Sequence, residues 1–340
     1  MNYAIRFVVL LLVLLTGCQS SEVDREQLLP RSNKVLNQIV ILCPSGECNA
    51  DIKEAVKFIF GSSIKGLYEP EPAFDLIYVS DIHASKIFSS QPYVIKLNLD
   101  ANSKTDKIGF QKNKWAKQQL YFQFEASDQL ALQALILNRG SAVLDLIEKH
   151  QLERFRVELS KEVQPPNDRT LSLSLAEGFE LVDSDTNYSY YGAFGQGLCK
   201  AGTQINCRFQ LGYLVFEKAY NGSQMFAEDS LVTLQNTLTK QLILGPEKEH
   251  PTYMETVSSF PMSRDTVSQG QTFVVRHSGW WDMVGATMGG PYRLYAFVNP
   301  RTGKLNAILS FAFAPGLEKR DYLLKMDHTT RLLIERFGQE

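Results

Sequence analysis

The sequence lacks the short motifs that mark common catalytic and cofactor sites. It has no His-Glu-x-x-His zinc pair, phosphate-binding loop, Gly-x-Ser-x-Gly elbow or dinucleotide fingerprint. Its five histidines are scattered, and His277 is followed directly by Ser278, so a strand would point the two side chains to opposite faces. We therefore expect no metal and no cofactor, and the sequence assigns no catalytic residue.

The chain also lacks an excess of positive charge. Its 35 lysines and arginines are balanced by 37 acidic residues, which gives a net charge of −2. Nucleic acids and anionic surfaces are recognised by clustered basic residues. We expect no nucleic-acid partner.

Cysteine is scarce, with five residues in the chain. Four of them form two local pairs, Cys43/Cys48 and Cys199/Cys207, and each intervening loop contains turn residues. Disulfides are the favoured interpretation for a protein in an oxidising compartment, and each short loop would stabilise the fold by roughly 2–3 kcal/mol. Zinc is the alternative, although neither spacing is that of a usual zinc knuckle.

Long apolar runs are missing too, and the run at the N-terminus is short. Phe7–Leu15 is an unbroken apolar stretch of nine residues that follows the charged Arg6. This length is insufficient to span a bilayer as a helix and is typical of the core of a secretory signal.

The residues that close this run resemble the lipobox of bacterial lipoproteins. They read Leu15-Thr16-Gly17-Cys18. The resemblance implies cleavage between Gly17 and Cys18, a diacylglyceryl thioether on Cys18, and acylation of the new amino terminus, with palmitate as an expected chain. Several acyl chains on one cysteine make attachment to a membrane effectively permanent. The alternative is an ordinary signal peptide with a chance cysteine.

The residue after the cysteine indicates which membrane is the target. By the same resemblance, an aspartate there would favour retention in the inner membrane, and this chain has Gln19. We expect an outer-membrane lipoprotein that faces the periplasm. Glu22, Asp24 and Glu26 loosely resemble acidic signals for export to the cell surface, but a solvated tether explains them more simply.

Length and periodicity predict an α+β protein with two similar sandwich domains, each a mostly antiparallel sheet with helices packed on one face. The mature chain of 323 residues exceeds what one core usually supports. The sequence Pro165-Pro166-Asn167-Asp168 is the best boundary signal. The predicted parts are a signal peptide (1–17), a lipidated flexible tether (18–32), a first α+β domain (33–163) and a second one (164–340).

Alternating or continuous apolar residues predict the strands, and a 3.6-residue period predicts the helices. Gly140 is expected to bend or split the second helix. The sequence at 299–304 is a strong hairpin signal. The predicted strands are 39–42, 74–79, 93–99, 120–124, 171–175, 209–215, 272–276, 292–298 and 305–313, and the predicted helices are 51–60, 127–147, 227–238 and a last one from about 318.

The sequence Asp183-Ser184-Asp185-Thr186-Asn187 resembles the opening of a calcium loop. Tyr188 replaces the required glycine, and Phe194 stands where the bidentate glutamate should fall. An Asx-rich turn is the better interpretation.

The densest group of chemically distinctive residues lies near the C-terminus. Adjacent tryptophans in a strand point to opposite faces, so one can be buried while the other is available to a ligand. The sequence Gly289-Gly290-Pro291 permits close approach of a second backbone or a ligand. The functional interpretation is an aromatic surface with a carboxylate, suited to a sugar or a peptide, and the alternative is core packing. The candidate binding patch comprises Trp280, Trp281, Asp282, Gly289, Gly290, Tyr292, Arg320 and Asp321.

The same residues carry a family resemblance. The stretch from Gly279 to Tyr322, with its Met-Gly-Gly-Pro and Ala-Pro-Gly-x-x-Lys-Arg-Asp-Tyr segments, resembles an uncharacterised family of bacterial envelope lipoproteins known as a domain of unknown function. The cysteine pairs and Trp281 are not features of that family. The resemblance implies an outer-membrane lipoprotein and supplies no catalytic residue. Four earlier segments agree with it, namely 29–32, 70–75, 115–118 and 253–254.

These features favour a non-enzymatic binding or envelope-assembly module over an enzyme that acts on envelope glycan or peptide. Exposed aromatic residues and turns can bind a ligand without the convergent polar groups that catalysis needs. The expected partners are the membrane, through the acyl chains on Cys18, and an envelope protein or glycan.

The lipid anchor gives the first testable prediction. We expect the mature protein to be acylated at Cys18 and to partition into the detergent phase on phase separation. The Cys18→Ala variant should yield an uncleaved precursor or a soluble product. Normal membrane retention of a cleaved Cys18→Ala protein would contradict the lipoprotein assignment.

Overall fold

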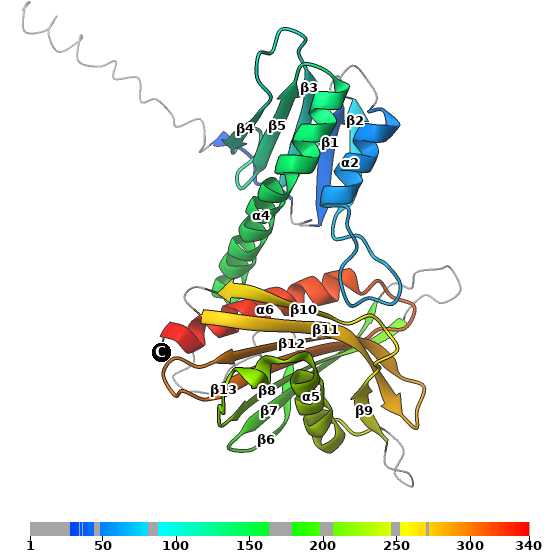
Figure 1. Cartoon of the computed structure of the whole chain (residues 1–340), viewed down its shortest axis with the longest axis vertical. Helices are drawn as coiled ribbons and strands as arrows, with labels where there is room; N and C mark the ends of the chain where they lie inside the picture. The colour runs from blue at the N-terminus through cyan, green and yellow to red at the C-terminus, as the bar shows by residue number, and fades with distance from the viewer. Residues whose placement is uncertain are drawn as a thin grey trace, which may run out of the picture. The chain divides into compact units, whose positions relative to one another are not determined.

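The computed structural model of the chain describes residues 28–33, 35, 37–43, 48–80, 88–162, 179–197, 207–245, 252–269 and 272–339. These residues form two compact units. The first unit comprises the described residues of Met1–Ala55 together with Leu76–Asn138, and the second comprises those of Val56–Asp75 and Arg139–Glu340. The α+β class in two parts is confirmed (Figure 1). The sequence at 165–168 lies outside the described residues, so that boundary stays a prediction, as do the signal, the tether and Cys18.

The first unit contains a five-stranded sheet in the order β2-β1-β3-β5-β4. The pairs β1–β3 and β3–β5 are parallel, and β4–β5 is antiparallel. The mostly antiparallel arrangement predicted for this unit therefore does not hold at its centre. Parallel central strands are buried on both faces, which accounts for the nearly continuous apolar sequence of β1. The elements that contribute to this unit are β1 (Gln38–Cys43), α2 (Ala50–Phe60), β2 (Asp75–Ser80), β3 (Tyr93–Leu99), β4 (Lys107–Lys112), β5 (Leu120–Ala126) and α4 (Gln129–Glu162).

A disulfide closes the connection between β1 and α2. Cys43 and Cys48 are bonded, with their Cα atoms 5.1 Å apart, as the sequence predicted. The side chain of Asn49 then accepts a hydrogen bond of 2.9 Å from the backbone N–H of Ile52 and so caps the start of α2. Cys207 is also disulfide-bonded, and Cys199 lies outside the described residues.

Helix α4 is continuous through Gly140, where the sequence predicted a bend or a break. The reason for a glycine here is packing, because a Cβ atom at this position would lie 2.9 Å from the Cγ2 atom of Ile59. The segment Gln129–Val157 is long and apolar enough to cross a membrane by length and composition. The core helix of a soluble protein meets the same criteria, so this composition by itself assigns no membrane crossing.

The second unit contains an eight-stranded antiparallel sheet in the order β10-β11-β12-β13-β8-β7-β6, with β9 paired to β11. The predicted hairpin between β12 and β13 is confirmed, since the N–H of Asn299 donates to the carbonyl of Lys304 at 2.9 Å. The elements are β6 (Glu180–Ser184), β7 (Tyr188–Gly197), β8 (Cys207–Lys218), η5 (Ser223–Phe226), α5 (Glu228–Leu242), β9 (Tyr253–Thr256), β10 (Ser263–Gln269), β11 (Thr272–Val284), β12 (Gly289–Val298), β13 (Leu305–Phe313) and α6 (Arg320–Gln339).

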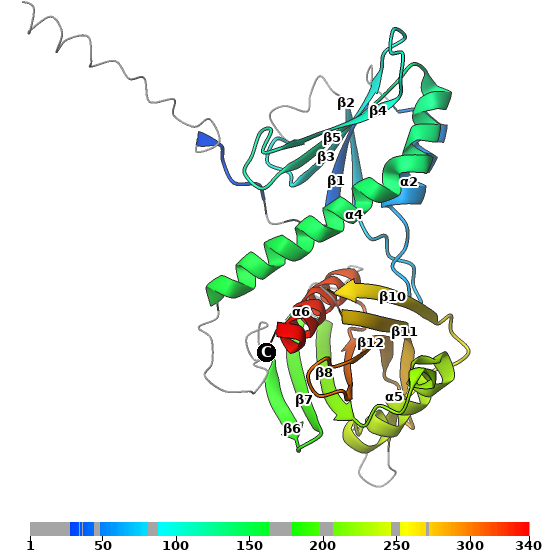
Figure 2. The same cartoon turned by 60° about the vertical axis from the view of Figure 1, so that its left-hand side comes forward.

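The large sheet is covered by a helix on each face, and not on one face as predicted (Figure 2). Successive residues of a strand alternate between the two faces. On β12, Leu294 packs in one apolar cluster with Leu231 of α5. The next residue, Tyr295, packs in the other cluster with Met326 and Leu333 of α6. The second unit is therefore a helix–sheet–helix arrangement with two cores.

A buried network of charges joins α6 to three strands of this sheet. Asp327 of α6 is 5% exposed and accepts hydrogen bonds from Arg293, at 2.7 Å, and from the hydroxyl of Tyr295. Arg276 lies 3.7 Å from Asp327 and pairs through two hydrogen bonds with Asp265 of β10. Burial raises the pKa of Asp327, but the two arginines outweigh it and hold that pKa well below its usual range. Removing one partner of such a network typically costs about 3–5 kcal/mol.

The histidine next to this network gives a pH-dependence that can be measured. Burial beside Phe155 lowers the pKa of His328 to about 4, from an ordinary value of about 6.5. The unfolded chain therefore binds a proton between about pH 6.5 and 4 that the folded chain does not. Stability must fall as the pH drops through this window, by about 3 kcal/mol. Denaturant midpoints at pH 4.5–7.5 should show this loss.

The His328→Gln variant should have a flatter stability profile over the same pH range. The variant will retain part of the slope, because burial also lowers the pKa of His277. An unchanged slope in His328→Gln would contradict the assignment of the proton to His328.

Candidate functional site

The two adjacent tryptophans of β11 lie on opposite faces of the large sheet, as predicted. Trp281 is 1% exposed and packs edge-on against Phe311, with the ring centroids 5.7 Å apart. It belongs to the apolar cluster on the α5 side, together with Val275 and Met283. Strand alternation turns Trp281 away from the C-terminal helix α6, so the buried tryptophan packs on the α5 side alone.

Trp280 takes part in a partly exposed group of aromatic rings. Its ring lies 6.0 Å from that of Tyr68 and 5.9 Å from that of Phe260. Tyr68 and Phe260 meet edge to face at 4.8 Å. Tyr68 is 62% exposed, whereas the other two rings are half-buried. We call Tyr68, Phe260 and Trp280 the aromatic surface.

An exposed carboxylate borders the aromatic surface. Asp282 accepts a hydrogen bond of 3.2 Å from the indole N–H of Trp280. Gly289 leaves room for this carboxylate, because a Cβ atom on Gly289 would lie 2.2 Å from its Oδ1 atom. At Gly290 a Cβ atom would lie 1.9 Å from the carbonyl oxygen of Ala312. Gly290 therefore permits the close approach of a second backbone, as predicted, whereas Gly289 makes room for a side chain.

Tyr292 is a core residue and takes no part in the aromatic surface. It is fully buried on the α5 face, and its hydroxyl lies 3.1 Å from Nδ1 of His277. Burial raises the pKa of Tyr292 above its usual range. The neutral tyrosine and histidine form a polar contact inside an apolar core.

Arg320 and Asp321 lie at the start of α6. Arg320 is 5% exposed and makes a two-pronged pair with Asp75, with distances of 2.8 and 3.0 Å, and a bond of 3.1 Å to the exposed Asp321. Burial lowers the pKa of this guanidinium, but the hydrogen bonds to Asp75 and Asp321 outweigh the burial and raise it. The guanidinium of Arg320 therefore has a structural role, because its hydrogen bonds hold it to Asp75 and Asp321.

The candidate patch thus separates into three places. Trp280, Asp282 and Gly289 are together beside Tyr68 and Phe260. The core contains Trp281, Gly290 and Tyr292. The start of α6 contains Arg320 and Asp321. Among the described contacts, none joins Asp282 to Arg320 or Asp321.

The sequence did not reveal the segment that brings Tyr68 to Trp280. Gly66 has a φ of +86°, and a Cβ atom there would lie 3.2 Å from Cβ of Ser278 on β11. Farther along, both carboxylate oxygens of Glu71 accept from the backbone N–H groups at the start of α6. The one available signal in the sequence was the motif at 70–75. This motif is unusual, but it does not indicate which part of the chain the segment contacts.

The acidic sequence at 183–187 forms a turn between β6 and β7. Asp185 accepts hydrogen bonds from the backbone N–H groups of Asn187, at 2.5 Å, and Tyr188, at 3.0 Å, so the Asx-turn interpretation is confirmed. The hydroxyl of Tyr188 donates to Asp183, and this bond raises the pKa of Tyr188 to about 12. Within the described residues, no cluster of three or more His, Cys, Asp or Glu side chains could hold a metal ion.

Family models match both parts of the chain. Residues 180–331 match a domain of unknown function (DUF4837), and residues 32–160 match a second one (DUF8532). These matches agree with the resemblance to an uncharacterised family, and neither description names an activity. No curated protein matches this chain.

Among solved structures, the Ran-binding protein Mog1p of Saccharomyces cerevisiae aligns with 12% identity over 48% of this chain and 82% of its own. The TM-score is 0.24. A similarity at this level carries no argument about function.

Proposed function

We propose that this protein is a lipid-anchored, non-enzymatic binding module of the outer membrane that faces the periplasm and recognises an envelope glycan. The observation that carries the proposal is the aromatic surface of Tyr68, Phe260 and Trp280, bordered by the exposed carboxylate of Asp282. Tyr68 comes from a part of the chain far from Phe260, Trp280 and Asp282 in the sequence. Three aromatic rings in contact are common inside an apolar core. Here, however, the side chain of Tyr68 is 62% exposed and is therefore accessible to a ligand.

The chemistry of this surface suits a sugar. Aromatic faces offer flat apolar area to the C–H face of a pyranose ring, and the tyrosine hydroxyl adds a polar tip. A carboxylate accepts strong hydrogen bonds from hydroxyl or amide groups. Asp282 is held by Trp280 at the edge of the rings, where it can accept such bonds from a stacked ligand.

The geometry supports binding over catalysis. An enzyme acting on envelope glycan or peptide would need polar groups that converge on the scissile bond. Arg320 is held by Asp75 and lies in a separate group of contacts from Asp282. Asp282 therefore lacks a second functional group from the predicted patch with which to act.

The proposed location is supported by the N-terminal sequence. The lipobox-like residues 15–18 and the following Gln19 favour acylation and the outer membrane. The bond between Cys43 and Cys48 suits an oxidising compartment such as the periplasm.

Paired variants of the adjacent tryptophans test the proposal. We expect Trp280→Ala to melt within a few degrees of the wild type and to lose binding to peptidoglycan sacculi freed of protein. Trp281→Ala should be destabilised by about 3–5 kcal/mol, as large-to-small core changes are. The measurements are thermal melts and co-sedimentation with sacculi for both variants.

Three results would overturn the proposal. Equal destabilisation of both variants would mean that the pair is simply core. Sacculus binding by Trp280→Ala at the wild-type level would remove the aromatic surface from recognition. The third result is a wild type that fails to bind sacculi and instead binds an envelope protein that Trp280→Ala does not bind. In that case the partner is a protein and the glycan assignment is wrong.

A further inference from the structure

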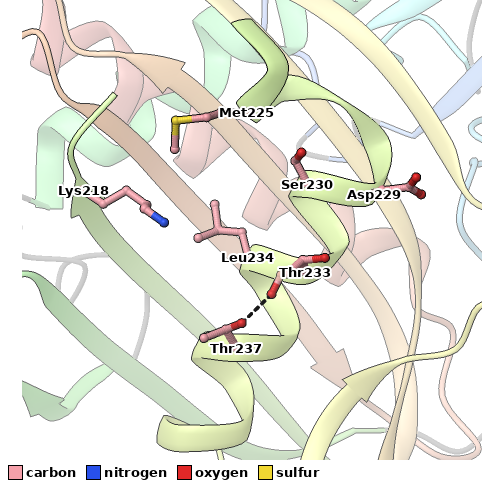
Figure 3. A pocket seen from close by; sticks show the side chains of 7 residues that line it. All are labelled: Lys218, Met225, Asp229, Ser230, Thr233, Leu234 and Thr237. Atoms are coloured by element: carbon pink, nitrogen blue, oxygen red, sulfur yellow. Dashed lines mark hydrogen bonds between the residues drawn. The ribbon is translucent and has the colours of Figure 1, made fainter. Parts of the chain in front are cut away.

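A surface cavity of about 380 Å³, open to solvent, lies between α5 and the end of β8 in the second unit (Figure 3). Small-molecule sites typically have volumes of about 300–1,000 Å³. None of the residues of the aromatic surface lines this cavity, so it is a separate feature. The lining residues are Lys218, Met225, Asp229, Ser230, Thr233, Leu234 and Thr237.

One wall of the cavity is a row of hydroxyl groups on α5. Ser230, Thr233 and Thr237 are spaced by three and four residues, which places them on one face of the helix. The hydroxyl of Thr237 donates to the carbonyl of Thr233 at 2.7 Å, so its oxygen can still accept a hydrogen bond. The opposite face of α5 is buried through residues such as Leu231 and Thr239.

The apolar part of the lining consists of two flexible side chains. Met225 of η5 and Leu234 of α5 both pack at the border of the apolar cluster on this side of the sheet. Figure 3 shows Leu234 projecting from the helix toward Lys218, with Met225 nearby. Methionine adapts its shape readily to different apolar ligands. These two residues offer an apolar contact area next to the hydroxyl row.

One cation faces this lining. Lys218 ends β8, and its ammonium group points toward α5 in Figure 3. Among the described salt bridges, none involves Lys218, and the neighbouring Glu217 is paired with Lys304 at 2.6 Å. The carboxylate of Asp229 points away from Lys218. The cavity therefore combines one unpaired positive charge, hydroxyl groups and a small apolar area.

We propose that this cavity binds a small amphipathic anion. The carboxylate or phosphate of the ligand lies at Lys218 and the hydroxyl groups of α5, and its apolar body lies on Met225 and Leu234. The charge selects an anion over a neutral molecule, and the volume limits the ligand to a small one.

Methyl NMR on the mature chain with Cys18→Ala tests this inference, because that chain keeps both folded units and needs no detergent. The protein is labelled with [methyl-¹³C]methionine, and Met225→Leu assigns the Met225 signal. We expect octanoate or octyl phosphate to shift this signal saturably, and the stronger of the two identifies the head group. Octanol should bind several-fold more weakly.

Charge variants separate anion recognition from apolar contact. Lys218→Met should weaken octanoate binding by about three- to fivefold, the upper part of the range for an exposed charge pair. Lys218→Arg should retain binding. Octanoate binding should be unchanged in Lys240→Met, which lies on α5 outside the cavity, and in Trp280→Ala.

Three outcomes would overturn the inference, namely no shift of Met225 with either anion, equal binding of octanol and octanoate, or Lys218→Met that binds like the wild type. The Trp280→Ala control keeps these outcomes independent of glycan binding at the aromatic surface.

Discussion

The carboxylate of Glu71 at the start of α6 is the interaction on which the placement of α6 and of the segment 61–75 depends. The first N–H groups of a helix have no partner within the helix and carry a partial positive charge. Glu71 is 6% exposed and accepts from the N–H groups of Lys319, at 2.9 and 3.0 Å, and Arg320, at 2.7 Å. These bonds offset the cost of burying its charge. A residue 248 positions earlier in the chain thus sets where α6 begins.

Two consequences follow from this cap. It fixes the register of α6 over the sheet, and with it the position of Asp327 among Arg293, Arg276 and Tyr295. Within the second unit it also holds the segment Val56–Asp75 beside α6, which brings Tyr68 to Trp280. The position of the buried charge network and that of the proposed binding surface therefore both depend on the cap formed by Glu71.

The cap also explains why some sequence motifs occur, since the residues of one motif contact those of another. The segment 70–75 and the segment 319–322 meet through Glu71, Asp75 and Arg320. In the first unit, the segments 29–32 and 115–118 meet as well, since the N–H of Lys117 donates to the carbonyl of Pro30 and the N–H of Ser32 donates to that of Lys117. The segments that carried the family resemblance contact each other in pairs.

Local patterns in the sequence were sufficient for much of this fold. Alternating apolar residues predicted the strands β3, β5, β8, β12 and β13, and the helical period predicted the helices α2, α5 and α6. Because successive residues of a strand point to opposite faces, the sequence also predicted that only one of Trp280 and Trp281 is buried. Short polar strands such as β4 and β10 were missed because they contain only one or two apolar residues each.

Long-range partners could not be predicted. Nothing near Tyr68 indicates a contact with Phe260, and nothing near Lys218 indicates a cavity beside α5. These features depend on how elements pack, which periodicity does not encode.

Hydrogen exchange at the start of α6 tests the central claim most directly. The backbone amides of Lys319 and Arg320 can be compared in the wild type, in Glu71→Ala, and in Glu69→Ala as a control two residues away. We expect Glu71→Ala to lose protection both at these amides and across residues 61–75, while β12 and β13 stay protected and Glu69→Ala resembles the wild type. Unchanged protection of Lys319, Arg320 and the 61–75 segment in Glu71→Ala would contradict the account.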